Sequence, residues 1–132
     1  MVELDFGGVK ETVTTRNEFP VEKAKEILKK ETIAVLGYGI QGRAQSLNMR
    51  DNGLCVIIGQ DKRFTKNWEQ ALEDGWVPGE TLFSLTEAAK RGTMIQYLVS
   101  DAGQKLLWSE IKPCLNPGDA LYFSHGCCSP SL

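Results

Sequence analysis

The sequence has no long hydrophobic run, little net charge and a single histidine, and these shortages exclude several classes of protein. No apolar stretch approaches the ~20 residues that span a bilayer, and residues 1–5 lack the character of a signal peptide. With 15 Lys and Arg against 17 Asp and Glu, the chain lacks the basic surplus typical of nucleic-acid-binding proteins. We therefore expect a cytoplasmic protein, or one from an organelle interior if a presequence has been removed.

Cysteine is present but not in a metal-binding pattern. The four cysteines show neither a CxxC pair nor Cys/His spacing, so no zinc site is predicted. Cys55 lies in an apolar run and is expected in the core. Cys127 and Cys128 are adjacent near the end of the chain, where exposed, reduced thiols are the favoured interpretation and a metal or redox role stays open.

At 132 residues with 42% hydrophobic content, the chain is long enough for one domain with a real core. Residues 4–14, with Gly7-Gly8 between two β-prone runs, predict a hairpin or an edge extension of the sheet, and Pro20 begins a helix that runs to Lys30. From residue 32 on, strands alternate with helices. The expected strands are residues 32–36, 54–58, 94–99 and 120–123, and the expected helices are 41–50, 67–74, 85–91 and 101–111. This alternation predicts an α/β fold, a Rossmann-like open parallel sheet with helices on both faces.

Within this pattern, Ala44 and Leu47 are expected to face the sheet from the helix at 41–50. Asn67 is expected to cap the following helix, and Ser84 begins a capping-box pattern with Glu87.

A glycine motif follows directly on the first apolar strand of this alternation: Gly37-Tyr38-Gly39-Ile40-Gln41-Gly42. A buried strand, a glycine turn and a helix in this order place a pyrophosphate on backbone N–H groups at the helix N-terminus. The first glycine allows a tight turn, the second lets the phosphates approach, and the third lets the helix pack closely. The motif predicts dinucleotide binding.

The segment after the second strand indicates which dinucleotide. NAD-binding domains usually hold the ribose 2′-OH with an acid at the end of this strand, whereas here the strand ends in Gly59-Gln60. The next seven residues contain three cations against one carboxylate. Lys62 and Arg63, with Thr65 and Asn67, suit a 2′-phosphate and favour NADP, although Asp61 argues for NAD.

Taken together, residues 34–53 resemble the nucleotide-binding motif of the ketol-acid reductoisomerase (acetohydroxy-acid isomeroreductase) family. Four more segments resemble it in order and spacing: Phe6-Gly7-Gly8, residues 73–79, residues 98–102 and residues 121–126. The resemblance implies the N-terminal NADP-binding domain of an enzyme of valine, leucine and isoleucine biosynthesis. Such enzymes isomerise acetohydroxy acids in a magnesium-dependent step and then reduce them with NADPH to 2,3-dihydroxy acids.

The resemblance also assigns residues to parts of the cofactor. Tyr38, Gly39, Ile40 and Gln41 would line the pyrophosphate turn, and Lys62 or Arg63 would hold the 2′-phosphate, which of the two being open. Val99, Ser100, Asp101 and Ala102 would lie beside the ribose and nicotinamide. His125, the only histidine, matches the active-site histidine of the family.

Relative to the family, the chain looks incomplete, with residues 1–19 as an extension, 20–126 as βα units and 127–132 as an atypical tail. The tail resembles what a frameshift, premature stop or cloning boundary would leave. Magnesium in the family is held by carboxylates of a helical domain, and Glu22, Glu26, Glu69 and Glu73 are interpreted as surface residues. We therefore expect no metal ligands and no turnover from this chain alone, and self-association through uncovered apolar surface.

Two alternatives stay open. A stand-alone NAD(P)-sensing regulatory module of this fold would need no catalytic domain, although residues 76–79 and 124–126 argue against it. A non-functional gene fragment would retain the same sequence pattern.

Overall fold

The computed structural model describes residues 1–124, and the chain divides into two compact units, residues 1–30 and 31–132. In the first unit, strands β1 (Val2–Asp5) and β2 (Lys10–Val13) form an antiparallel hairpin. Its turn contains Gly7 and Gly8, both with positive φ. Helix α1 (Val21–Leu28) follows Pro20. The hairpin and the helix predicted from the sequence are therefore confirmed.

The second unit contains a five-stranded sheet in which every neighbouring pair is parallel, in the order β5-β4-β3-β6-β7. The strands are β3 (Ile33–Leu36), β4 (Val56–Gly59), β5 (Leu82–Phe83), β6 (Met94–Tyr97) and β7 (Ala120–Tyr122). Every residue of β3 and β4 is buried, as expected for parallel strands covered on both faces. The sequence predicted four of these strands and missed β5, whose two residues are too few to show a pattern.

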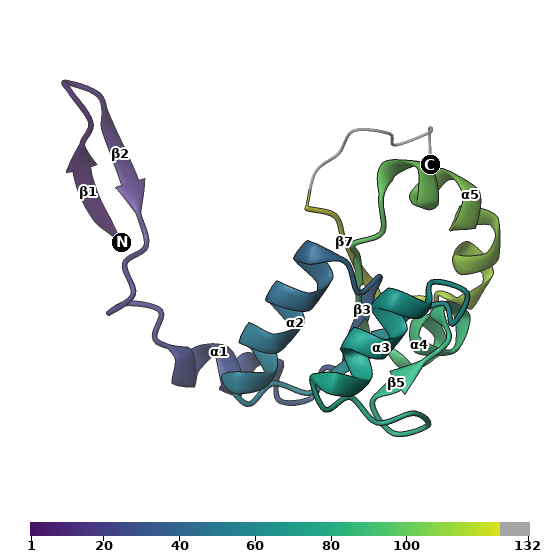
Figure 1. Ribbon diagram of the computed structural model, residues 1–132. Coiled ribbons are helices and arrows are strands. Elements are labelled where there is room, and N and C mark those ends of the chain that lie inside the picture. The colour runs from purple at the N-terminus through teal and green to yellow at the C-terminus, as the bar shows by residue number, and fades with distance from the viewer. Residues whose placement is uncertain (125–132) are drawn as a thin grey trace. The chain divides into compact units, whose positions relative to one another are not determined.

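Helices cover both faces of the sheet (Figure 1). They are α2 (Ile40–Asp51), α3 (Thr65–Glu73), α4 (Leu85–Arg91) and α5 (Asp101–Ile111), followed by a 3-10 turn at Lys112–Cys114. Leu47 of α2 and Ala71 of α3 pack in one apolar cluster, whereas Ala88 of α4 and Ile111 of α5 pack in the other. The predicted Rossmann-like arrangement is confirmed.

Three local expectations were wrong. Helix α3 begins at Thr65, so Asn67 lies in its first turn and does not cap it. Ala44 is exposed and Ser46 is buried instead, because α2 approaches the sheet closely at Gly42, four residues before Ser46. Cys55 is exposed, because the buried part of its strand begins one residue later, at Val56. The cap of α4 is confirmed, since the Ser84 hydroxyl accepts a hydrogen bond from the Glu87 N–H.

Among residues 1–124, no helix is both long enough and apolar enough to cross a membrane.

Candidate functional site

The site predicted from the sequence lies at the carboxyl ends of the strands of the parallel sheet. Strand β3 is central, and the chain builds β4 and β5 on one side of it before crossing to β6 and β7 on the other. The order of the strands therefore reverses between β3 and β6. In open α/β sheets this switch point is where ligands bind, beyond the carboxyl ends of the strands.

The glycine turn joins β3 to α2 at this point. Gly37 has φ +98°, and a β-carbon there would lie 2.9 Å from a methyl group of Val99. A β-carbon at Gly42 would collide with the Gly37 carbonyl oxygen, so α2 packs directly on the turn. Gly39, with φ −79°, has no atom within 4 Å of an added β-carbon. The turn is thus tightly packed at its first and third glycines and open at its second.

Tyr38 is held on both its backbone and its side chain. Its N–H donates a 2.7 Å hydrogen bond to Oε1 of Gln60, which is 4% exposed at the end of β4. The Tyr38 ring is buried, so this residue faces the protein and not the open side of the turn. Ile40 is 89% exposed, and Gln41 is exposed beside it on the first turn of α2. The predicted turn residues therefore lie together. Ile40 and Gln41 are exposed, whereas the side chain of Tyr38 is buried in the protein.

The basic segment after β4, residues 61–67, contains one acid, Asp61, which pairs with Arg63. The Arg63 Nε donates to Asp61 Oδ2 at 2.8 Å, and the Arg63 N–H donates to Oδ1 at the same distance. This pairing lowers the pKa of Asp61 and raises that of Arg63. Lys62 Nζ lies 4.9 Å from the centre of the Trp68 ring, as in a cation–π contact. Thr65 and Asn67 lie in the first turn of α3, directly beyond these cations.

A cavity of about 260 Å³ adjoins this segment. It is lined by residues that follow β4 and β5 and by residues of α3, α4 and α5: Gln60, Asp61, Lys62, Arg63, Trp68, Ser84, Leu85, Thr86, Leu107 and Glu110. Pockets for drug-sized ligands are usually about 300–1,000 Å³, so this one suits part of a dinucleotide, such as an adenosine.

On the other side of the switch point, residues 99–102 lead from β6 into α5. Val99 packs against the glycine turn, and Ser100 caps α5 by accepting a hydrogen bond from the Gly103 N–H at 3.2 Å. Asp101 and Ala102 form the first turn of that helix. The structure thus brings this predicted segment to the same edge as the glycine turn. His125 lies outside the described residues.

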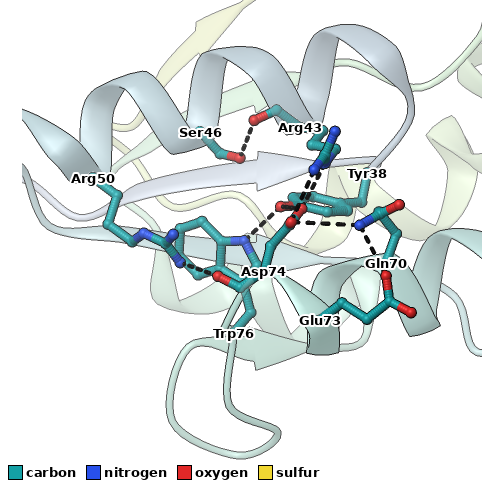
Figure 2. A network of polar contacts seen from close by, with 8 residues as sticks. All are labelled: Tyr38, Arg43, Ser46, Arg50, Gln70, Glu73, Asp74 and Trp76. Atoms are coloured by element: carbon teal, nitrogen blue, oxygen red, sulfur yellow. Dashed lines mark hydrogen bonds and ion pairs between the residues drawn. The ribbon is translucent and has the colours of Figure 1, made fainter.

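Behind the turn, the Tyr38 hydroxyl joins a polar network that the sequence did not predict (Figure 2). It donates to Asp74 Oδ2 at 2.8 Å and accepts from Trp76 Nε1 at 2.7 Å. Arg43 donates to both Asp74 oxygens, at 2.6 and 2.9 Å. Arg50 donates to the Asp74 carbonyl oxygen at 2.7 Å and lies over the Trp76 ring.

The ionisation of these groups follows from their partners. The bond from Arg43, aided by that from Tyr38, lowers the pKa of Asp74 to about 2. Burial and the neighbouring Asp74 carboxylate raise the pKa of Tyr38 to about 12. At neutral pH the network is therefore an ionised carboxylate held by a guanidinium and a neutral phenol.

Sequence reasoning missed the residues that support the predicted site. The sequence did not indicate that Gln60 is buried against the turn, because a polar residue after a strand is usually exposed. Asp74 and Trp76 lie in residues 73–79, which resemble the family. Nothing in the spacing of that segment indicated that it contacts the glycine turn. Glu22, Glu26, Glu69 and Glu73 are all exposed, as expected. Within residues 1–124, no three His, Cys, Asp or Glu side chains lie close enough to hold a metal ion.

Comparisons with known proteins match the same region. The family model described as "Acetohydroxy acid isomeroreductase, NADPH-binding domain" matches residues 27–128. The chain is 58% identical over 126 residues to "Ketol-acid reductoisomerase (NAD(+))" of Desulfosudis oleivorans, covering 96% of this chain and 36% of that protein. It is 44% identical over 107 residues to "Ketol-acid reductoisomerase (NADP(+))" of Pyrobaculum arsenaticum, covering 80% of this chain and 31% of that protein.

A solved structure is similar as well. It is titled "Structure of NADH-preferring ketol-acid reductoisomerase from an uncultured archean", and it superposes with a TM-score of 0.70 at 38% identity. The match covers 76% of this chain and 31% of the other. The chain therefore spans about a third of the length of the proteins it matches.

Proposed function

From the premise that this chain belongs to the acetohydroxy acid isomeroreductase (ketol-acid reductoisomerase) family, as its NADPH-binding domain, we propose that the chain itself binds NADPH. The observation that carries the proposal is the glycine turn. It is closed at Gly37 and Gly42 and open at Gly39, where the N-terminus of α2 meets the switch point of the sheet. Backbone N–H groups and the helix dipole favour a pyrophosphate there.

Each part of the cofactor has a place in this proposal. The pyrophosphate lies over Gly39–Gly42, and the adenosine occupies the cavity after β4. Lys62 and Arg63, with Thr65 and Asn67, hold the 2′-phosphate. The ribose and nicotinamide lie along residues 99–102, with His125 as the catalytic residue of the family pattern.

To bind NADPH, Arg63 must give up at least one side-chain hydrogen bond to Asp61 and donate to the 2′-phosphate. A phosphate with about −2 charge competes well for a guanidinium that is 81% exposed. Because the relatives include one named for NAD(+) and one titled NADH-preferring, the choice of dinucleotide must be measured directly.

The reaction of the whole family is proposed to need more than the described residues. Residues 1–124 offer no cluster that fits magnesium, a cation that needs several oxygen ligands converging from fixed elements. We derive no metal-dependent step from this chain and propose that it binds the cofactor without turnover. NADPH oxidation by the purified chain with an acetohydroxy acid and Mg²⁺ would contradict this.

The compartment of the protein is proposed to be the cytoplasm or, as for relatives named mitochondrial, an organelle interior.

Self-association is proposed as well, through the end of the sheet at β7. Among residues 31–124, β7 pairs with β6 alone, so its other edge is unpaired. Tyr122 and Phe123 are 43% and 38% exposed there. An unpaired strand edge with exposed aromatic rings is a template for a second chain.

The function is tested by calorimetric titration of the full chain with NADPH and then NADH, repeated with Lys62→Ala/Arg63→Ala. We expect NADPH to bind more tightly than NADH and the double variant to lose that preference. A matched control is Lys90→Ala/Arg91→Ala on α4, where Arg91 likewise pairs with an acid and lies over a ring. It should bind like the wild type. Failure of the wild type to bind either nucleotide would overturn the proposal.

A further inference from the structure

The network behind the glycine turn has no part in the function as stated so far. It links Tyr38, the residue between the first two glycines, to Asp74 at the end of α3 (Figure 2). Asp74 lies beyond Tyr38, whose ring is buried beneath the turn, so we do not assign the carboxylate a contact with nucleotide.

We propose that Asp74 is a positioning residue for nucleotide binding, which fixes the pyrophosphate turn through Tyr38 and Arg43. This inference rests on the proposed NADPH-binding function and extends it to Asp74, which is not proposed to contact the nucleotide.

The glycine turn is flexible by itself. Gly37 and Gly39 flank Tyr38, and glycine has the largest backbone freedom to lose on ordering. The turn therefore needs an anchor, and Tyr38 is the flanked residue with a side chain. Its ring cannot leave without stripping Trp76 Nε1 and Asp74 of a partner. Leaving the buried Trp76 N–H unpaired costs about 1–3 kcal/mol, and Asp74 keeps its bonds from Arg43 but loses the one from Tyr38, so the ring fixes the backbone between the glycines.

Helix α2, whose N-terminus would face the phosphates, also needs a fixed position. Of its twelve residues only Gly42 and Ser46 are buried, and its apolar contacts with the core come from Leu47 and Met49, in its second half. Two arginines two turns apart bind the same residue. Arg43 donates to the Asp74 carboxylate, and Arg50 donates to the Asp74 carbonyl oxygen. Asp74 thereby sets where the first turn of α2 lies against α3.

Asp74 also balances the charge of Arg43. A cation in the first turn of a helix opposes the positive end of the helix dipole. The bidentate bond to Asp74 neutralises Arg43 and directs its guanidinium toward α3. The positive field offered to the phosphates then comes from the backbone N–H groups. If Arg43 were instead a direct phosphate ligand, releasing it from Asp74 would strengthen binding.

The test compares Asp74→Asn and Tyr38→Phe with wild-type full chain, each confirmed folded by circular dichroism. Asp119→Asn is the control for the first, because it removes a different carboxylate that likewise accepts a hydrogen bond, here from the backbone N–H of Asn116 at 2.7 Å. Tyr97→Phe is the control for the second, since it removes a buried hydroxyl that donates to a carbonyl oxygen.

Three readouts separate positioning from general stability: NADPH affinity, affinity for adenosine 2′-monophosphate, and amide hydrogen exchange of residues 37–43 without ligand. We expect both test variants to weaken NADPH binding about tenfold and to speed exchange in the turn about tenfold, since each loses a charge-assisted bond. Adenosine 2′-monophosphate has no pyrophosphate, so its affinity should change by less than about twofold. Both controls should resemble the wild type.

The inference is overturned if Asp74→Asn binds NADPH as well as or better than the wild type. It is also overturned if both ligands weaken equally, or if exchange rises evenly over β6 and the turn. If Asp74→Asn does not fold, the milder Tyr38→Phe decides by the same criteria. If the wild type binds no nucleotide, the proposed function fails by itself, and exchange in residues 37–43 alone decides whether Asp74 fixes the turn.

Discussion

A β-carbon added at Gly42 would collide with the carbonyl oxygen of Gly37, so the third glycine of the turn is required by direct contact between helix and backbone. Gly42→Ala must push α2 away from the turn. We expect a loss of unfolding free energy of about 1–3 kcal/mol or more, as for overpacked cores, together with loss of NADPH binding. Urea unfolding and calorimetry measure the two effects.

Gly39→Ala is the informative counterpart, because an added β-carbon there meets no atom within 4 Å. Its φ of −79° is open to alanine. We expect unchanged unfolding free energy, but NADPH binding weakened about tenfold or more, because the methyl group occupies the open face proposed for phosphate. Unchanged affinity in a folded Gly39→Ala variant would place the pyrophosphate elsewhere.

The sequence predicted the elements around this turn because their signals are local. An apolar run, three glycines and a helix pattern are contiguous, and so is the capping pair Ser84 and Glu87. The supporting contacts could not be predicted in this way. Tyr38 meets Asp74 across 36 positions, and it meets Gln60 across 22. Such pairs depend on how α3 packs beside α2, which no short pattern encodes. Strand β5 was missed because its two residues are too few to show a pattern, and its pairing with β4 joins segments distant in the sequence.

Asp61 is expected to decide the choice between the two dinucleotides. Its carboxylate binds Arg63 and lines the cavity after β4, and in NAD-binding domains an acid after this strand accepts the ribose 2′-hydroxyl. Asp61→Asn frees Arg63 for a 2′-phosphate and removes the stronger acceptor. We expect the ratio of NADPH to NADH affinity to rise about tenfold, measured by calorimetry with both ligands.

Glu87→Gln provides the control for this change, because it frees Arg91 from a comparable exposed pair at 2.7 Å on α4. Its affinity ratio should equal that of the wild type. A shift of Asp61→Asn toward NADH would mean that Arg63 serves to hold the loop and does not read the phosphate.

Tyr122, 43% exposed on the unpaired edge of β7, is expected to mediate self-association. Tyr122→Lys puts a charge on that edge and should keep the chain monomeric at concentrations where the wild type associates. Sedimentation velocity over a concentration series measures this. Leu72→Lys, a similarly exposed site on α3 at 42%, should associate like the wild type. Equal association of all three proteins would place the contact elsewhere.

Asp74 should also make the free energy of unfolding depend on pH. Its pKa is about 2 in the folded chain against an ordinary value of 3.8, chiefly because Arg43 binds the carboxylate. A carboxyl whose folded pKa is depressed stabilises the fold above the unfolded value and loses that contribution as the pH falls through the folded one. The loss should therefore occur between about pH 4 and pH 2.

The comparison that isolates this effect is wild type against Asp74→Asn, by urea unfolding from pH 7 to pH 2. At pH 7 the wild type should be more stable by on the order of 1–2 kcal/mol, an amount reduced for partial solvent screening. That difference should shrink below pH 4 as the carboxyl is protonated. Asp61 titrates in both proteins, so its contribution cancels. Glu69→Gln, at an exposed position of α3 five residues before Asp74, should follow the wild type throughout. A difference that stays constant down to pH 2 would mean that Asp74 acts through its shape and not through its charge.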